Sequence, residues 1–275
     1  MWIAAGSVLI VIFMYLFLVF PAPATKQMRA RFKGHAYAHR GLHDVENGLI
    51  ENTLPAFQAA ADAGYGIELD VQLTKDMFPV VFHDLDLSRA CGDERRICDI
   101  DLDELVSIPI FGSSGRIPLF ADVLNAVNGC VPLVVEIKSD GNRALVKICC
   151  ETVAAMLLDY DGDYCIESFD PYAVQWFFKN VPKIVRGQLV MGISGYNDSI
   201  PWKLKVLMVN LFFNFLTRPN FIAFRHCDRG FPLKVVKLLG AMSVMWTVTN
   251  QDDHDKLSKS EDAIIFEGYL PATRY

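Results

Sequence analysis

Short apolar runs alternate with longer amphipathic stretches through most of the 275-residue chain, and this alternation constrains the fold more than any other feature. It is typical of βαβ units, in which a helix returns the chain so that the next strand runs parallel to the last. We predict eight strands, at residues 35–38, 66–73, 80–82, 133–137, 164–167, 184–189, 221–224 and 243–248.

Helical periodicity fills the stretches between these runs. It predicts helices at residues 53–63, 119–127, 143–158, 171–179 and 232–239, with Gly64, Gly129 and Gly240 placed as C-terminal stops. Eight strands with intervening helices favour an α/β fold of the closed (β/α)8 TIM-barrel type, occupying residues 35–275. No G-x-G-x-x-G or P-loop motif follows any predicted strand, which argues against a nucleotide site.

The N-terminal segment has a different composition. Residues 2–24 carry no charged side chain, which predicts a transmembrane helix and an anchor at residues 1–24. The alternative is a cleaved signal peptide: Ala22-Pro23-Ala24 resembles a cleavage site, but no basic residue precedes the apolar run. A basic linker, residues 25–34, follows with Lys26, Arg29, Arg31 and Lys33, which predicts a single-pass membrane protein whose catalytic domain is cytoplasmic.

Charge and cysteine content narrow the class of protein further. The formal net charge of -6 argues against a nucleic-acid partner, because such proteins need a basic surface to displace counterions. The seven cysteines are odd in number and lack metal-ligand spacing, so we expect reduced thiols, in agreement with a cytoplasmic domain.

Acidic residues lie where the strands are expected to end. Glu68 and Asp70 are two residues apart on one predicted strand, so their side chains point the same way and repel each other unless a cation lies between them. Glu136, in the fourth predicted strand, would complete an all-oxygen site that suits Ca²⁺ or Mg²⁺. The alternative is a solvated strand face.

Histidine and basic side chains follow the same strands. His39 and His83 lie at two strand ends, and a pKa near neutrality suits them to transfer protons at a phosphorus centre. Arg40 and Lys138 would bring positive charge to bind phosphate, or would form ion pairs with Glu51 or Glu136. These residues alone predict a metal-assisted hydrolase of phosphate esters.

An ordered set of motifs then resembles the glycerophosphodiester phosphodiesterase family over nearly the whole region after the predicted anchor. The matching residues are His39-Arg40-Gly41, Glu51-Asn52-Thr53, Glu68-Leu69-Asp70-Val71, His83-Asp84, Glu136-Ile137-Lys138, Ser168-Phe169 and Trp246-Thr247-Val248.

This resemblance implies hydrolysis of glycerophosphodiesters to sn-glycerol 3-phosphate and an alcohol. A divalent ion would be bound by Glu68, Asp70 and Glu136, with His39 and His83 as the acid and base. Arg40, Lys138, Glu51, Phe169 and Trp246 would bind phosphate or substrate, and Glu51 would orient its neighbours. The segment 85–117 matches the insertion expected after the third strand. The chain departs from the family pattern at residues 263–267, in the eighth strand of the family.

Residues 201–218 offer a second membrane signal. Asn210, Asn214 and Arg218 lie at four-residue spacing on one side of this otherwise largely apolar stretch, which predicts one amphipathic helix with a broad apolar face. A helix packed on the barrel is the alternative. If this stretch contacts lipid, the substrate is a lysophospholipid or phospholipid, cleaved with phospholipase D or C regiochemistry. A third alternative is a non-catalytic, membrane-tethered binding module.

Overall fold

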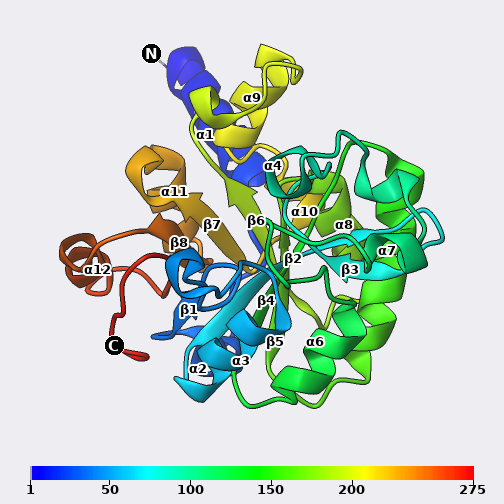
Figure 1. Cartoon of the computed structure of the whole chain (residues 1–275). Helices are drawn as coiled ribbons and strands as arrows, with labels where there is room; N and C mark the ends of the chain where they lie inside the picture. Colours follow the sequence, from blue (N-terminus) through cyan, green and yellow to red (C-terminus); the bar gives the residue numbers. More distant parts are fainter. Residues whose placement is uncertain (1) are drawn as a thin grey trace.

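A closed barrel of eight parallel strands forms the core of this computed structural model, which describes residues 2–275 and the side chains from residue 6 onward (Figure 1). The strands follow the ring order β1, β2, β4, β5, β6, β7, β8 and β9, and the ring closes because β1 pairs with both β2 and β9. The predicted TIM barrel is confirmed. The barrel strands are β1 (Ala36–Ala38), β2 (Gly66–Leu73), β4 (Leu133–Ile137), β5 (Tyr164–Ser168), β6 (Val185–Val190), β7 (Phe221–Arg225), β8 (Met242–Val248) and β9 (Ala263–Phe266).

One predicted barrel strand was wrong. The run at residues 80–82 forms β3 (Pro79–Val81), which pairs antiparallel with β2 outside the ring. The few residues between β2 and β3 allow a hairpin but are too few for a parallel crossover. The eighth place in the barrel belongs to β9, in the segment that departs from the family pattern.

The predicted helices lie where their periodicity placed them, within one or two residues at each end. They are α3 (Leu54–Asp62), α6 (Phe120–Val127), α7 (Arg143–Leu158), α8 (Pro171–Asn180) and α11 (Phe231–Leu238), and α12 (Gln251–Leu257) follows β8. The segment 85–117 contains α4 (Ser88–Cys91), η2 (Ile97–Asp99) and α5 (Leu102–Leu105). Further short 3-10 turns are η1 (Val45–Asn47), η3 (Ile193–Gly195) and η4 (His226–Asp228).

Apolar side chains fill the barrel at the end where its strands begin. Tyr37 and Phe221 are buried there, and a side chain at Gly66 or Gly187 would collide with their rings. The base is covered by α2 (Lys26–Phe32), whose Phe32 packs into the same cluster. The polar interior is therefore confined to the carboxyl ends of the strands.

The N-terminal helix α1 (Trp2–Val19) does not support the predicted transmembrane anchor. In the described part of the chain, no helix combines the length and apolar character needed to cross a bilayer. The last turns of α1 also pack on the protein, where Tyr15 contacts Phe212 and the buried Asn214 donates to the carbonyl of Val19.

The basic residues that follow α1 bind the base of the barrel. Arg29 forms an ion pair of 2.9 Å with Asp262, and Arg31 lies 3.4 Å from Asp163. Both acidic residues directly precede barrel strands. The cytoplasmic location inferred from these basic residues stays a prediction. All seven cysteines are unpaired.

The stretch 201–218 is not one amphipathic helix. It divides into α9 (Trp202–Val209) and α10 (Asn214–Thr217), separated by a turn in which Leu211 has a φ of +60°. Of the apolar side chains in this stretch, Phe212 and Phe215 face α1, where they pack on Tyr15 and Phe17. The packed alternative therefore describes α10, whereas α9 projects away from the barrel (Figure 1).

Candidate active site

Three buried carboxylates meet at the carboxyl ends of two neighbouring strands. Glu68 and Asp70 belong to β2 and Glu136 to β4, and the strand register sets Asp70 directly beside Glu136. One oxygen from each residue lies within 4.8 Å of the others. The sequence prediction that these three residues form one group is confirmed.

The electrostatics of this cluster favour a bound cation. Burial raises the pKa of Glu68 well above its usual value, and the neighbouring charges of Asp70 and Glu136 raise it further. Burial also raises the pKa of Glu136. For Asp70, the attraction of Lys138, His83 and Arg40 outweighs the burial and lowers the pKa. An all-oxygen set whose members resist simultaneous ionisation suits a hard divalent ion such as Ca²⁺ or Mg²⁺.

Two cations flank the carboxylates. The Nζ atom of Lys138 lies 3.2 Å from Oδ1 of Asp70 and 3.0 Å from Oε1 of Glu136. The Arg40 guanidinium lies 2.7 Å from Oε1 of Glu51. Both residues thus form the ion pairs that were one alternative from the sequence, and both lie at the carboxylate cluster.

The backbone of Arg40 is part of the same arrangement. Its φ is +56°, in the left-handed region that is unfavourable for a residue with a side chain. In this conformation its N–H donates to Oε2 of Glu68 at 3.0 Å, and its carbonyl accepts from the N–H of Asn52. Backbone strain of this kind is concentrated at functional sites.

His39 is oriented by an acidic residue that the sequence did not single out. Its Nδ1 lies 2.6 Å from Oε2 of Glu267, directly after β9, and its Nε2 lies 3.9 Å from Oε2 of Glu68. Burial lowers the pKa of His39, and the hydrogen bond to Glu267 partly opposes this. The hydrogen bond from His39 lowers the pKa of Glu267 to about 2.

His83 has a matching carboxylate partner. Its Nδ1 lies 2.7 Å from Oδ1 of Asp84, and Oδ2 of Asp84 accepts from Nε of Arg89 at 2.6 Å. Arg89, on α4, also donates to Glu51 at 2.6 Å. The insertion after β3 thus supplies a guanidinium that links Asp84, beside His83, to Glu51, beside Arg40.

Asn52 is a further buried residue that sequence reasoning left without a role. Its Nδ2 donates to Oδ2 of Asp70 at 2.8 Å, and its φ of +54° is left-handed. The only sequence signal was its position within the Glu51-Asn52-Thr53 motif. Glu167, beside Glu136 in the barrel register, is also buried, and no pattern in the sequence had distinguished it.

Three aromatic side chains lie close together at the barrel mouth. The ring of Phe169, after β5, lies 5.6 Å from that of Trp246 on β8 and 6.2 Å from that of Tyr196, both edge to face. Phe169 and Trp246, the two aromatic residues among those expected to bind phosphate or substrate, are therefore adjacent. They provide an apolar surface at the barrel mouth.

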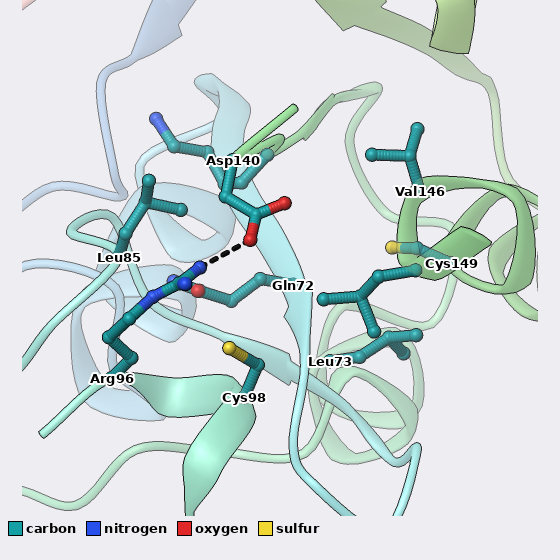
Figure 2. A pocket seen from close by; sticks show the side chains of 10 residues that line it. Gln72, Leu73, Leu85, Arg96, Cys98, Asp140, Val146 and Cys149 are labelled. Carbon is teal, nitrogen blue, oxygen red and sulfur yellow. Dashed lines mark hydrogen bonds and ion pairs between the residues drawn. The ribbon is translucent and has the colours of Figure 1, made fainter. Parts of the chain in front are cut away.

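A side pocket adjoins the carboxylates, between β2, α7 and the insertion (Figure 2). An ion pair between Arg96 and Asp140 crosses the pocket. Lys138 lines the pocket and also contacts Asp70 and Glu136 of the carboxylate cluster. The other lining residues are Gln72, Leu73, Leu85, Cys98, Leu145, Val146 and Cys149.

Comparisons of sequence support a single family. Residues 39–266 match the Glycerophosphoryl diester phosphodiesterase family. A Glycerophosphodiester phosphodiesterase of Caldanaerobacter subterraneus subsp. tengcongensis is 29% identical over 237 residues, covering 81% of this chain and 89% of that protein. Lysophospholipase D GDPD1 of Rattus norvegicus is 33% identical over 147 residues, covering 49% of this chain and 46% of that protein. The match thus spans about half the length of this last relative.

Solved structures share the fold. A phosphodiesterase of Oleispira antarctica, in complex with the product sn-glycerol-3-phosphate, superposes with a TM-score of 0.69 at 21% identity, covering 86% of this chain and 94% of that one. A glycerophosphodiester phosphodiesterase of Thermotoga maritima gives 0.65 at 22% identity, covering 85% and 94%. With the family match extending from His39 to Phe266, the chain belongs to the glycerophosphoryl diester phosphodiesterase family.

Proposed function

We propose that the protein hydrolyses glycerophosphodiesters to sn-glycerol 3-phosphate and an alcohol, with a divalent metal ion, Ca²⁺ or Mg²⁺, as its cofactor. The observation that carries this proposal is the buried cluster of Glu68, Asp70 and Glu136, flanked by two histidines that are each bound to a carboxylate through Nδ1. The family membership and the Caldanaerobacter relative support it.

Glu68, Asp70 and Glu136 would bind the ion. When bound, it would neutralise their charge and that of a phosphoryl oxygen. Asn52 and the backbone N–H of Arg40 hold one oxygen each of Asp70 and Glu68, and so fix the directions in which the remaining oxygens point.

His39 and His83 would transfer the protons. With Nδ1 of each ring held by a carboxylate, Nε2 is the atom free to exchange a proton with substrate. One histidine would accept the proton of the glycerol hydroxyl as that oxygen attacks phosphorus, and the other would protonate the departing alcohol oxygen. Water would then add to the cyclic phosphate and open it to sn-glycerol 3-phosphate.

Arg40 and Lys138 would bind the phosphate, because both cations already lie beside the carboxylates. Glu51 would orient Arg40, to which it is bound at 2.7 Å. Phe169 and Trp246 would contact the carbon atoms of the glycerol.

A lysophospholipid is the second candidate substrate, cleaved with phospholipase D regiochemistry. It is favoured by the similarity to Lysophospholipase D GDPD1. The chemistry at phosphorus would be the same, since both substrates present a glycerol hydroxyl beside a phosphodiester.

The test is the release of glycerol 3-phosphate from glycerophosphocholine and glycerophosphoethanolamine, and of lysophosphatidic acid from lysophosphatidylcholine. Each is measured with Ca²⁺, Mg²⁺ or chelator, for wild type and His39→Ala. We expect metal-dependent release that the substitution abolishes, with the preferred substrate separating the two candidates. A folded preparation that turns over none of these substrates with any ion would contradict the proposal, and release of phosphocholine would indicate phospholipase C regiochemistry instead.

A further inference from the structure

The N-terminal part of α1 exposes apolar side chains on every side. From Val8 to Met14, all seven side chains are apolar, and their exposed fractions lie between 49% and 73%. A helix that packs on a globular core hides at least one face, whereas an apolar surface of this size on a monomer marks a contact with a partner or a membrane.

This part of α1 extends beyond the active-site end of the barrel. The N–H of Ala22 donates to the carbonyl of Pro219, which lies just before β7 at the base of the barrel. Tyr15, in contrast, stacks on Phe231, which follows the carboxyl end of β7. The chain therefore runs from the rim at Tyr15 to the base at Ala22, and the residues before Tyr15 project outward. From Trp2 to Met14 the helix rises about 20 Å.

Helix α9 adds to this projection. It follows the carboxyl end of β6, and Figure 1 shows it beyond the barrel at the same end as the N-terminal half of α1. Its Trp202 is 68% exposed, and Leu204 and Leu207 are exposed as well. Its Lys205 is held against the protein by the carbonyl of Tyr196 at 3.0 Å, which fixes the outward face of the helix.

The charge pattern fits a bilayer better than a protein partner. Residues 2–20 carry no charged side chain, so the projecting part of α1 has no ion pairs with which to orient another protein chain. Around it, α9 carries the exposed Lys203 and no acidic residue, although the chain as a whole is acidic. Tryptophan and lysine beside an apolar segment suit the headgroup region.

We propose that the apolar residues of α1 and α9 form a membrane-docking surface that enters one leaflet of a bilayer. We refer to Val8–Met14 with Trp202, Leu204 and Leu207 as the docking surface. Because the docking surface lies at the active-site end, the barrel mouth faces the headgroups, where a lysophospholipid presents its phosphodiester. Only this last point rests on the proposed function.

The experiment measures flotation of the full chain with phosphatidylcholine vesicles. We expect the wild type to float with the vesicles and the triple variant Leu9→Ser, Phe13→Ser, Trp202→Ser to partition at least about a hundredfold more weakly, because each exposed apolar side chain contributes to burial in lipid. The matched control is Leu238→Ser. That leucine is 88% exposed at the base end of α11 and should not change flotation.

Activity is measured on the same proteins, so that failures can be told apart. The triple variant should keep wild-type turnover of soluble glycerophosphocholine and lose turnover of lysophosphatidylcholine in vesicles. Three outcomes would overturn the docking surface. The wild type and the triple variant could float equally, or the wild type could fail to float. The wild type could also be a dimer and the triple variant a monomer, which would make the apolar surface a dimer interface. Flotation without turnover of either substrate would overturn the proposed function and leave the docking surface intact.

Discussion

His39 and Glu267 are 228 residues apart in the chain, yet Nδ1 of the imidazole lies 2.6 Å from Oε2 of the carboxylate. The contact exists because β9 closes the barrel against β1, which sets Phe266 beside Ala38 and so the two following residues beside each other. A carboxylate on Nδ1 fixes the tautomer and orientation of the ring and stabilises its protonated form.

Replacing Glu267 by Gln should slow catalysis while leaving the fold intact. The amide keeps the size of the carboxylate but loses the charge that stabilises the imidazolium. We expect kcat for glycerophosphocholine to fall by about 10- to 100-fold with little change in KM. Steady-state kinetics measure this, with Glu46→Gln on an exposed turn as the matched control. Wild-type kcat in the Glu267 variant would mean that His39 needs no such partner.

The carboxylate cluster could be predicted from sequence, because the period-2 alternation of a strand fixes which side chains share a face. That is why Glu68 and Asp70 were placed together, and the βα rhythm added Glu136. Direction is not encoded in an apolar run, so β3 was assigned to the ring. Glu267 was missed because its role depends on which strands close the barrel.

The N-terminal segment and residues 201–218 show a second limit of prediction from sequence. Composition cannot distinguish an apolar helix in lipid from one that packs on protein along part of its length, as α1 does through Tyr15. Nor does apolar spacing reveal the left-handed turn at Leu211 that separates α9 from α10.

Metal binding should stabilise the protein, because it relieves repulsion among the buried carboxylates. At an ion concentration about 100 times the Kd, we expect about 2.7 kcal/mol of added stability. Differential scanning calorimetry with chelator and with Ca²⁺ or Mg²⁺ measures the change in Tm. Glu68→Gln should raise the Tm in chelator, because it removes the acid whose pKa is most disfavoured by burial and like charge, and should abolish the response to ion. A lower Tm for Glu68→Gln than for wild type, both in chelator, would contradict this account.

Acid should destabilise the protein through the ion pairs of Arg89. Although burial opposes it, the hydrogen bonds from His83 and Arg89 lower the pKa of Asp84 to about 2. The pKa of Glu51 is also lowered, because Arg89 and Arg40 outweigh burial. Carboxyl groups with a depressed folded-state pKa contribute stability above their unfolded pKa, near 4, and lose it as the pH falls toward about 2.

Arg89→Met tests this linkage, because it removes the guanidinium while keeping much of the apolar stem. Urea unfolding at several pH values between 7 and 2 should show a lower free energy of unfolding for the variant at pH 7 and a smaller loss on acidification than in wild type. Arg116→Met is the control, since Arg116 bonds only backbone carbonyls of its own loop among the described contacts. Parallel pH profiles for wild type and Arg89→Met would exclude this contribution.

Asn52 combines two roles that substitutions can separate. Its left-handed backbone costs an ordinary residue about 1–2 kcal/mol, which glycine avoids, and its side chain donates to Asp70. Asn52→Gly should therefore lose the hydrogen bond alone, and Asn52→Ala should lose it and add strain. We expect both variants to bind the metal ion more weakly in calorimetric titration, since Asp70 is no longer oriented, whereas Asn52→Ala should also have a lower free energy of unfolding than Asn52→Gly. Unchanged ion affinity in Asn52→Gly would show that the amide does not orient Asp70, and equal stability of the two variants would show that the backbone conformation carries no strain.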